Sequence, residues 1–224
     1  PQDTGGIDFH VLNRGVRRMQ LFDRPGDYDA YLSLFAAGQR RTPMRCLAYC
    51  LMPNHFHFVL WPYEDRDLSD FMFWLSTIHA RRWHLARGPG SNGHVYQGRF
   101  KALPVCADGH FLRVCRYVER NPVRAGLTSR AEDWAWSSFA QRIGRRRGIL
   151  LADCPVQRPE SWAEIINEPA DPEAAEVRQA IRKSAPLGPE LWRQLIANRL
   201  DMSSHLRPTG RPVRTKPGLI FQAP

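Results

Sequence analysis

The sequence predicts an α+β fold in which helices pack on an antiparallel sheet. Strand-like and helix-like stretches follow one another in mixed order along residues 1–151. Pro53 and Asn54 separate two apolar runs, and this turn signal predicts an antiparallel hairpin. With 224 residues, 43% of them hydrophobic, the chain can bury a sizeable core.

The expected elements span residues 7 to 121. They are a strand at 7–14, a helix at 27–40, strands at 43–52 and 55–62, a helix at 67–87, a strand at 95–105 and a helix at 108–121. The first helix has Asp27 as its candidate cap. The helix at 67–87 repeats apolar residues at spacings of three and four, which predicts ordinary amphipathic packing.

The composition changes near residue 150, where prolines become frequent between two short helical stretches, 172–183 and 189–200. We therefore expect a main domain over residues 1–150. A small, loosely attached helical appendage at 151–203 and a flexible basic tail at 204–224 should follow it.

The charge is concentrated in the first two thirds of the chain. Residues 1–151 hold 22 basic and 13 acidic side chains, so they carry +9 of the net charge of +10. Arginines make up 29 of the 32 basic residues, and the planar guanidinium suits phosphate recognition. A polyanion such as nucleic acid is the partner that this balance favours.

Other classes of protein are disfavoured. The five cysteines are an odd number and form no C-x-x-C pair, which argues against a disulfide framework and against a zinc ribbon. No apolar run approaches the roughly 18 residues of a membrane span, and no charged-then-apolar leader opens the sequence. We expect a cytoplasmic protein with no membrane partner.

His55 and His57 are the first candidates for chemistry. Alternate residues of a strand share a face, so both imidazoles point the same way, at a separation that can bind one metal ion. A pair of ordinary strand histidines is the alternative. Two histidines make an incomplete metal site, so a third ligand must come from elsewhere.

The helix at 108–121 offers further polar candidates. Its apolar stripe contains Phe111, Cys115 and Val118. A different face carries a tyrosine hydroxyl among arginines, one turn before an amide. The residues on this face are Arg113, Tyr117, Arg120, Asn121 and, more loosely because Pro122 should end the helix, Arg124. A surface tyrosine packed on arginine stems fits the same pattern.

Two motifs together resemble a known family. M-P-N-H-F-H-F-V-L at 52–60, followed by Y-V-E-R-N-P-V-R-A-G-L at 117–127, is similar to the HUH (His-hydrophobe-His) single-tyrosine transposases, and most similar to the REP-associated tyrosine transposases. Supporting stretches are H-V-L-N-R-G at 10–15, Y-Q-G-R-F-K at 96–101, W-A-W-S-S-F at 134–139 and G-R-P at 210–212. The resemblance covers about residues 5–150.

The resemblance implies an HUH endonuclease domain of ferredoxin-like fold. His55 and His57 would be metal ligands, Tyr117 the nucleophile, and Asn121 the third ligand where relatives have glutamine. The ion would be Mg²⁺ or Mn²⁺, and the softness of this ligand set favours Mn²⁺. Attack by Tyr117 would give a 5′-phosphotyrosine and a free 3′-hydroxyl.

The implied substrate is single-stranded DNA that carries hairpins, as in DNA transposition. The protein would act as a monomer or as a homodimer that shares active sites, and would associate with the bacterial nucleoid. The expected DNA contacts are Arg14, Arg99, Lys101, Arg113, Arg120, Arg124 and Arg211. Arg211 belongs to the G-R-P segment, which could enter a minor groove or be a plain proline-rich tail.

Two other functions stay open. A non-cleaving, hairpin-binding relative of a transposase would keep the fold without the chemistry. A metal-dependent hydrolase that uses water would leave Tyr117 dispensable. Core or surface roles are expected for the remaining histidines: His10, His79, His84, His94, His110 and His205.

Overall fold

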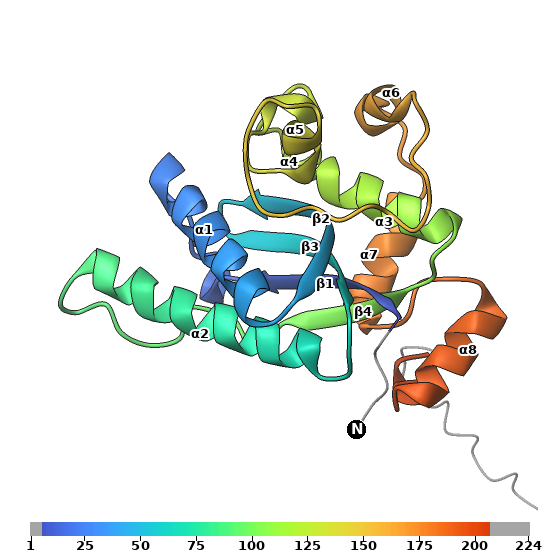
Figure 1. Ribbon diagram of the computed structural model, residues 1–224, viewed down its shortest axis with the longest axis horizontal. Helices are drawn as coiled ribbons and strands as arrows, with labels where there is room; N and C mark the ends of the chain where they lie inside the picture. Colours follow the sequence, from blue (N-terminus) through green and yellow to red (C-terminus); the bar gives the residue numbers. More distant parts are fainter. Residues whose placement is uncertain (1–5, 207–224) are drawn as a thin grey trace, which may run out of the picture.

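The computed structural model describes residues 6–206 and is built on one four-stranded antiparallel sheet (Figure 1). The strands lie in the order β2-β3-β1-β4. Their bounds are β1 Asp8–Arg14, β2 Met44–Met52, β3 His55–Pro62 and β4 Lys101–Val105. The predicted α+β class and antiparallel sheet are thus confirmed.

Helices cover both faces of the sheet, with α1 and α2 on one face and α3 on the other (Figure 1). The α-helices are α1 Pro25–Arg41, α2 Asp67–Arg87, α3 Gly109–Glu119, α4 Asn121–Arg124, α5 Ser138–Arg142, α6 Trp162–Asn167, α7 Ala174–Lys183 and α8 Glu190–Arg199. Short 3-10 turns occur at Val16–Arg18, Ala131–Asp133 and Ser203–Leu206. Within residues 6–206, no helix combines the length and apolar character that crossing a membrane requires.

Side-chain alternation along the strands gives the sheet two separate cores. Phe9 and Val11 of β1 pack with Phe56 and Phe58 of β3 in the core beneath α1 and α2. The intervening residues face α3, where Val59 packs in the second core. His55, His57 and Tyr117 lie on this second face.

Elements predicted from local patterns agree closely with the structure. The helix at 67–87 and the strand at 55–62 have the predicted bounds. Helix α1 begins at Pro25, two residues before the expected Asp27. Asp27 is the third residue of the helix rather than the residue before it. Its Oδ2 accepts hydrogen bonds from the backbone N–H groups of Asp23 and Arg24, and these bonds stabilise the start of the helix.

The expected strand at 95–105 is too long. Only β4, residues 101–105, pairs continuously with β1, and Tyr96 makes an isolated bridge to Gly15. Between them Asn13 donates its side-chain N–H to the carbonyl of Gly98. This contact holds residues 97–100 as a loop beside the sheet, so that Arg99 is presented to solvent.

The segment after residue 150 is not loosely attached. Trp162, Ile166 and Val177 are buried in the core that α3 covers. Leu187 forms a parallel bridge with Val105 at the outer edge of β4, and Leu151 forms one with Cys46 at the outer edge of β2. Buried apolar side chains and backbone bridges therefore join residues 151–206 to the sheet. Arg211 and the G-R-P segment lie outside the described residues.

Candidate active site

The site lies at the end of the sheet where β1 ends and β3 begins. The register places Arg14 opposite His55 and Leu12 opposite His57. Because alternate residues share a face, Arg14, His55 and His57 all point toward α3, and so does His10. The guanidinium of Arg14, at the end of β1, thus lies beside the imidazoles of His55 and His57, which follow the turn at Pro53 and Asn54.

A hydrogen-bond chain fixes the imidazole rings. The ring centroids of His55 and His57 are 5.1 Å apart. Nδ1 of His57 lies 2.9 Å from Nε2 of His10, and Nδ1 of His55 lies 2.6 Å from Oδ1 of Asn54. Both rings use Nδ1 in these bonds, so Nε2 is the nitrogen that each can present to a ligand.

The imidazoles are neutral at ordinary pH. Burial, and then the positive charges of Arg14 and Arg124, lower the pKa of His55 to about 4. Burial lowers the pKa of His57 well below its usual value, with His10 and His55 adding to the effect. Neutral imidazole is the form that binds a metal ion.

Helix α3 brings Tyr117 to the same place. Its ring centroid lies 5.8 Å from that of His57 and 6.0 Å from that of His10, both in edge-on geometry. The guanidinium of Arg124 stacks over the Tyr117 ring, with Cζ 3.9 Å from the ring centroid. Tyr117 is thus held between two imidazole rings and a guanidinium.

Helix α4 completes the group. Arg124 Nη2 donates to Oδ1 of Asn121 at 2.7 Å, and Asn121 Nδ2 donates to the backbone carbonyl of Tyr117 at 3.3 Å. The Asn121 side chain also interacts with His55, and this interaction acts to raise the His55 pKa. Pro122 occupies the first turn of α4, where its missing N–H costs nothing, so the chain continues helically to Arg124.

These residues fit a divalent metal ion. Residues 6–206 contain no group of three or more His, Cys, Asp or Glu side chains that could hold a metal, so a third protein ligand must be of another kind. The amide of Asn121, in contact with His55, is such a donor. Two neutral imidazoles and an amide oxygen suit a borderline ion such as Mn²⁺ better than Mg²⁺.

His10, for which the sequence predicts a core or surface role, lies in the core and contacts His57, a contact that the sequence does not predict. It is 1% exposed, and burial together with Arg124 lowers its pKa to about 3. Its contact with His57 depends on how β1 pairs with β3, which no spacing within β1 reveals. The sequence signals were its place in the H-V-L-N-R-G stretch and its position four residues before Arg14, on the same strand face.

We expect His10→Leu to weaken Mn²⁺ binding about 10- to 100-fold, the usual effect of removing the partner that orients a metal ligand. His10→Gln should stay within a few fold of the wild type because an amide can still hydrogen-bond Nδ1 of His57. Isothermal titration with Mn²⁺ alone measures the effect. His79→Leu is the control, since it removes another buried histidine, from the opposite face. Equal affinity in His10→Leu and wild type would show that His57 needs no orienting partner.

The predicted basic contacts divide into two groups. Arg14, Arg99 and Lys101 line one open groove of about 390 Å³ that begins beside His55. Arg113 and Arg120 instead face the C-terminal segment. Arg113 pairs with carboxylates of Glu173 and Glu176, and the buried Arg120 donates to the carbonyls of Ile166 and Pro169. Arg120 is thus buried against backbone carbonyls, whereas Arg113 is partly exposed but already paired with two carboxylates.

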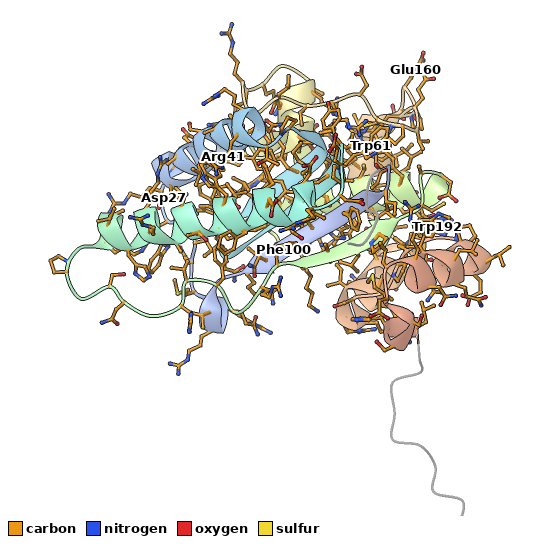
Figure 2. The ribbon with its side chains drawn as sticks, turned by 60° about the horizontal axis from the view of Figure 1, so that its bottom comes forward. Asp27, Arg41, Trp61, Phe100, Glu160 and Trp192 are labelled. Atoms are coloured by element: carbon orange, nitrogen blue, oxygen red, sulfur yellow. The ribbon has the colours of Figure 1, made fainter. Side chains whose placement is uncertain are left out.

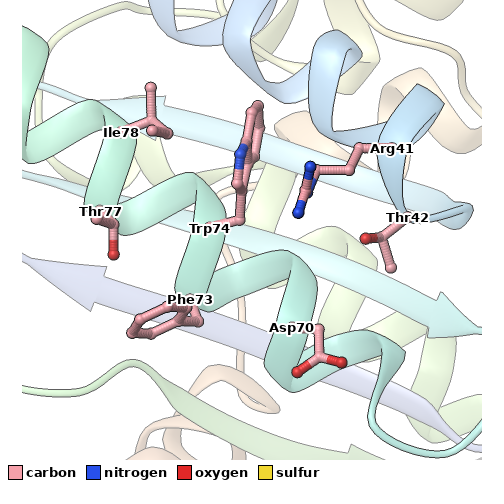
Figure 3. Close-up of a pocket in the computed structure, with 7 residues that line it drawn as sticks. All are labelled: Arg41, Thr42, Asp70, Phe73, Trp74, Thr77 and Ile78. Carbon is pink, nitrogen blue, oxygen red and sulfur yellow. The ribbon is translucent and has the colours of Figure 1, made fainter.

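A larger hollow lies on the other face of the sheet, apart from the candidate active site. It lies between α1 and α2 and has a volume of about 570 Å³ (Figure 3). Its lining residues are Arg41, Thr42, Asp70, Phe73, Trp74, Thr77 and Ile78. None of the predicted catalytic or metal-binding side chains lines it, so its size does not mark the active site.

Comparisons with known proteins point in one direction. Residues 4–121, just over half of the chain, match the family model described as "Transposase IS200 like". A REP-associated tyrosine transposase of Haemophilus influenzae is 24% identical over 152 residues, which cover 62% of this chain and 82% of the relative. Its counterpart in Escherichia coli K12 is 23% identical over 145 residues, covering 63% and 81%.

A solved structure gives the same result for the fold. It is that of a REP-associated tyrosine transposase bound to a REP hairpin, and it aligns with a TM-score of 0.52 at 22% sequence identity. The alignment covers 70% of this chain and 93% of the other. At this level of identity the match supports a shared architecture.

Proposed function

The chain belongs to the family of IS200-like transposases, and from that membership we propose that it cuts and rejoins single-stranded DNA through a covalent link to Tyr117. One observation supports the chemistry most. His55, His57, Asn121 and Tyr117 come from β3, α3 and α4, and they converge at one end of the sheet. A protein that only bound DNA would not need this convergence.

In the proposed reaction Tyr117 is the nucleophile. Its Oη forms a bond to the phosphorus, and the bond from phosphorus to the 3′-oxygen breaks. The products are a 5′-phosphotyrosine and a strand ending in a 3′-hydroxyl, once the departing oxygen has gained a proton. A free 3′-hydroxyl can reverse the step and join strands, because the bond energy is retained in the phosphotyrosine.

The side chains around Tyr117 supply charge and orientation. Arg124, stacked on the ring, places a positive charge beside the attacking side chain. Arg14, opposite His55, is placed to hold a phosphate oxygen. His55, His57 and Asn121 would hold the divalent ion, which when bound polarises the scissile phosphate.

Hairpin-bearing single-stranded DNA is the proposed substrate. The structural relative is bound to a REP hairpin, and this chain carries its excess positive charge within residues 1–151. The groove of Arg14, Arg99 and Lys101 runs away from the site, as a track for the phosphates of a single strand would.

The test is incubation of the protein with hairpin-bearing single-stranded DNA and Mn²⁺, followed by a denaturing gel. We expect a protein–DNA adduct that survives detergent and disappears when a chelator is added. Hairpin binding with no adduct in Mg²⁺ or Mn²⁺ would instead identify a non-cleaving hairpin-binding protein. Adduct formation that a chelator leaves unchanged would exclude the metal ion.

We expect His57→Ala to abolish Mn²⁺ binding and adduct formation together, because one of two imidazole ligands is lost. Asn121→Ala should weaken both without abolishing them, since the two imidazoles remain. Calorimetry and the adduct gel measure the two effects. His94→Ala, which removes an exposed histidine, is the control. Normal Mn²⁺ affinity in His57→Ala would move the metal site elsewhere.

The salt dependence of DNA binding tests whether the groove of Arg14, Arg99 and Lys101 holds the phosphates of the strand. Arg99→Ala should reduce the slope of log affinity against log salt by about 0.7 on a single strand, the contribution of one phosphate contact. It should weaken binding to all sequences similarly. Arg147→Ala removes another exposed arginine, outside the groove, and should leave the slope unchanged. Equal slopes for Arg99→Ala and wild type would show that Arg99 does not contact a phosphate.

A further inference from the structure

A second hollow adjoins the groove of Arg14, Arg99 and Lys101. It has a volume of about 250 Å³ and lies on the α2 side of the sheet. The two hollows share Asn13, Gly98 and Arg99, so together they form one continuous surface that leads from Arg14 to α2. The full lining of the second hollow is Asn13, Ser69, Met72, Phe73, Ser76, Thr77, Tyr96, Gly98, Arg99 and Phe100.

Phe73 is the unusual member of this lining. Its neighbours on α2, Phe71 and Met72, are buried in the core, whereas Phe73 is 72% exposed. Figure 3 shows its ring on the side of α2 away from Trp74. Phe100, half-buried, lies beside α2 and lines the same hollow (Figure 2). Two aromatic rings thus face one open cavity beside a cationic groove.

We propose that this hollow, which we call the base pocket, binds an unpaired base of the DNA strand by stacking it on Phe73 and Phe100. The proposal rests on the proposed function, because the strand that fills the pocket is the one held by Arg14 and Arg99. Aromatic side chains alternating with cations along a groove are the usual means of holding single-stranded nucleic acid.

The polar groups of the base pocket suit the edge of a base. Ser69 and Thr77 are exposed and can offer hydroxyls, which donate or accept hydrogen bonds. Asn13 is already committed, because its Oδ1 accepts from the N–H of Arg14 and its Nδ2 donates to the carbonyl of Gly98. Asn13 therefore fixes the wall between groove and pocket and does not read the base.

Charge distinguishes the base pocket from the neighbouring hollow of about 570 Å³ between α1 and α2. The base pocket is lined by one cation, Arg99, and by no carboxylate. The neighbouring hollow between α1 and α2 contains Asp70 together with Arg41. The base pocket therefore presents only positive charge to the phosphates of the strand, whereas the neighbouring hollow presents one charge of each sign.

The experiment compares a hairpin that has a single-stranded flank with the same hairpin without one. We expect Phe73→Ala to weaken binding of the flanked hairpin about 5- to 150-fold, the range for loss of one stacked base, and to leave the bare hairpin unaffected. Phe73→Trp should bind the flanked hairpin at least as well as the wild type. Leu85→Ala, at an exposed apolar position of the same helix, should change neither affinity.

Abasic sites placed one at a time along the flank locate the base. At one position, the abasic site should weaken binding by the wild type but should not weaken binding by Phe73→Ala any further. The missing base and the missing ring remove the same contact. If Phe73→Ala binds the flanked hairpin like the wild type, or loses affinity equally for both DNAs, the base pocket is wrong. If these effects appear but no adduct forms in Mn²⁺, the pocket stands and the proposed cleavage fails.

Discussion

Tyr117→Phe should abolish the covalent protein–DNA adduct and leave hairpin affinity within a few fold of the wild type. The substitution removes only the hydroxyl oxygen that would bond to phosphorus. The ring remains, and with it the packing against His57 and His10 and the stack with Arg124. We expect adduct formation to fall by more than about a thousandfold, as when a nucleophile is removed from other enzymes.

The denaturing gel measures the adduct, and fluorescence anisotropy with a labelled hairpin measures binding. Tyr63→Phe is the matched control, because Tyr63 is half exposed and lies just beyond the opposite end of β3. If Tyr117→Phe still cleaves the strand without forming an adduct, water is the nucleophile and the protein is a metal-dependent hydrolase. Undiminished adduct would place the nucleophile on another side chain.

The second large effect is expected at Glu119, two residues after Tyr117. Its carboxylate is fully buried and ties three segments together. Oε1 accepts from Ser138 Oγ at 2.6 Å and forms an ion pair with Arg158 Nη2 at 3.2 Å, and Oε2 accepts from Trp162 Nε1 at 2.9 Å. Residues far along the chain thus fix the orientation of α3, the helix that carries Tyr117.

Glu119→Ala should lower the free energy of unfolding by about 3–5 kcal/mol, because it leaves the guanidinium of Arg158 buried without its counter-charge. Urea denaturation measures the loss. Glu119→Leu combined with Arg158→Met should lose less than the single substitution, since no unpaired charge remains.

A surface ion pair provides the comparison for Glu119. Glu190 and Arg193 lie three residues apart on α8, with 2.9 Å between their charged groups. Glu190→Ala should change the free energy of unfolding by less than about 1 kcal/mol, because water screens exposed pairs. A similarly small loss in Glu119→Ala would mean that the carboxylate does not hold the three segments together.

Local patterns allowed much of this architecture to be predicted. The helix at 67–87 and the hairpin around Pro53 depend on periodicity and turn residues within a short window, and the structure confirms them. The strand at 95–105 was predicted too long because pairing with β1, rather than residue type, determines where β4 begins. The contact of His10 with His57 was not predicted for the same reason, since strand register sets it.

Arginines illustrate a second limit of sequence reasoning. Arg99 and Arg120 are indistinguishable by residue type, and both lie in segments that resemble the transposase family. Arg99 is exposed in a groove, whereas Arg120 is occupied by the carbonyl of Ile166, 46 residues further along the chain. A phosphate and a backbone carbonyl satisfy a guanidinium by the same hydrogen bonds, so only the fold distinguishes the two partners.

The bridges at the two outer strands have a consequence for synthesis. All four strands lie within residues 8–105, but the backbone partners of the edges come later, at Ser137 and Leu151 for β2 and at Leu187 for β4. A chain growing on the ribosome can therefore form its sheet while both edges still present unpaired N–H and C=O groups. Such edges pair readily with other chains. During translation, the interval between residue 105 and residue 187 is thus the period in which this protein is most exposed to aggregation.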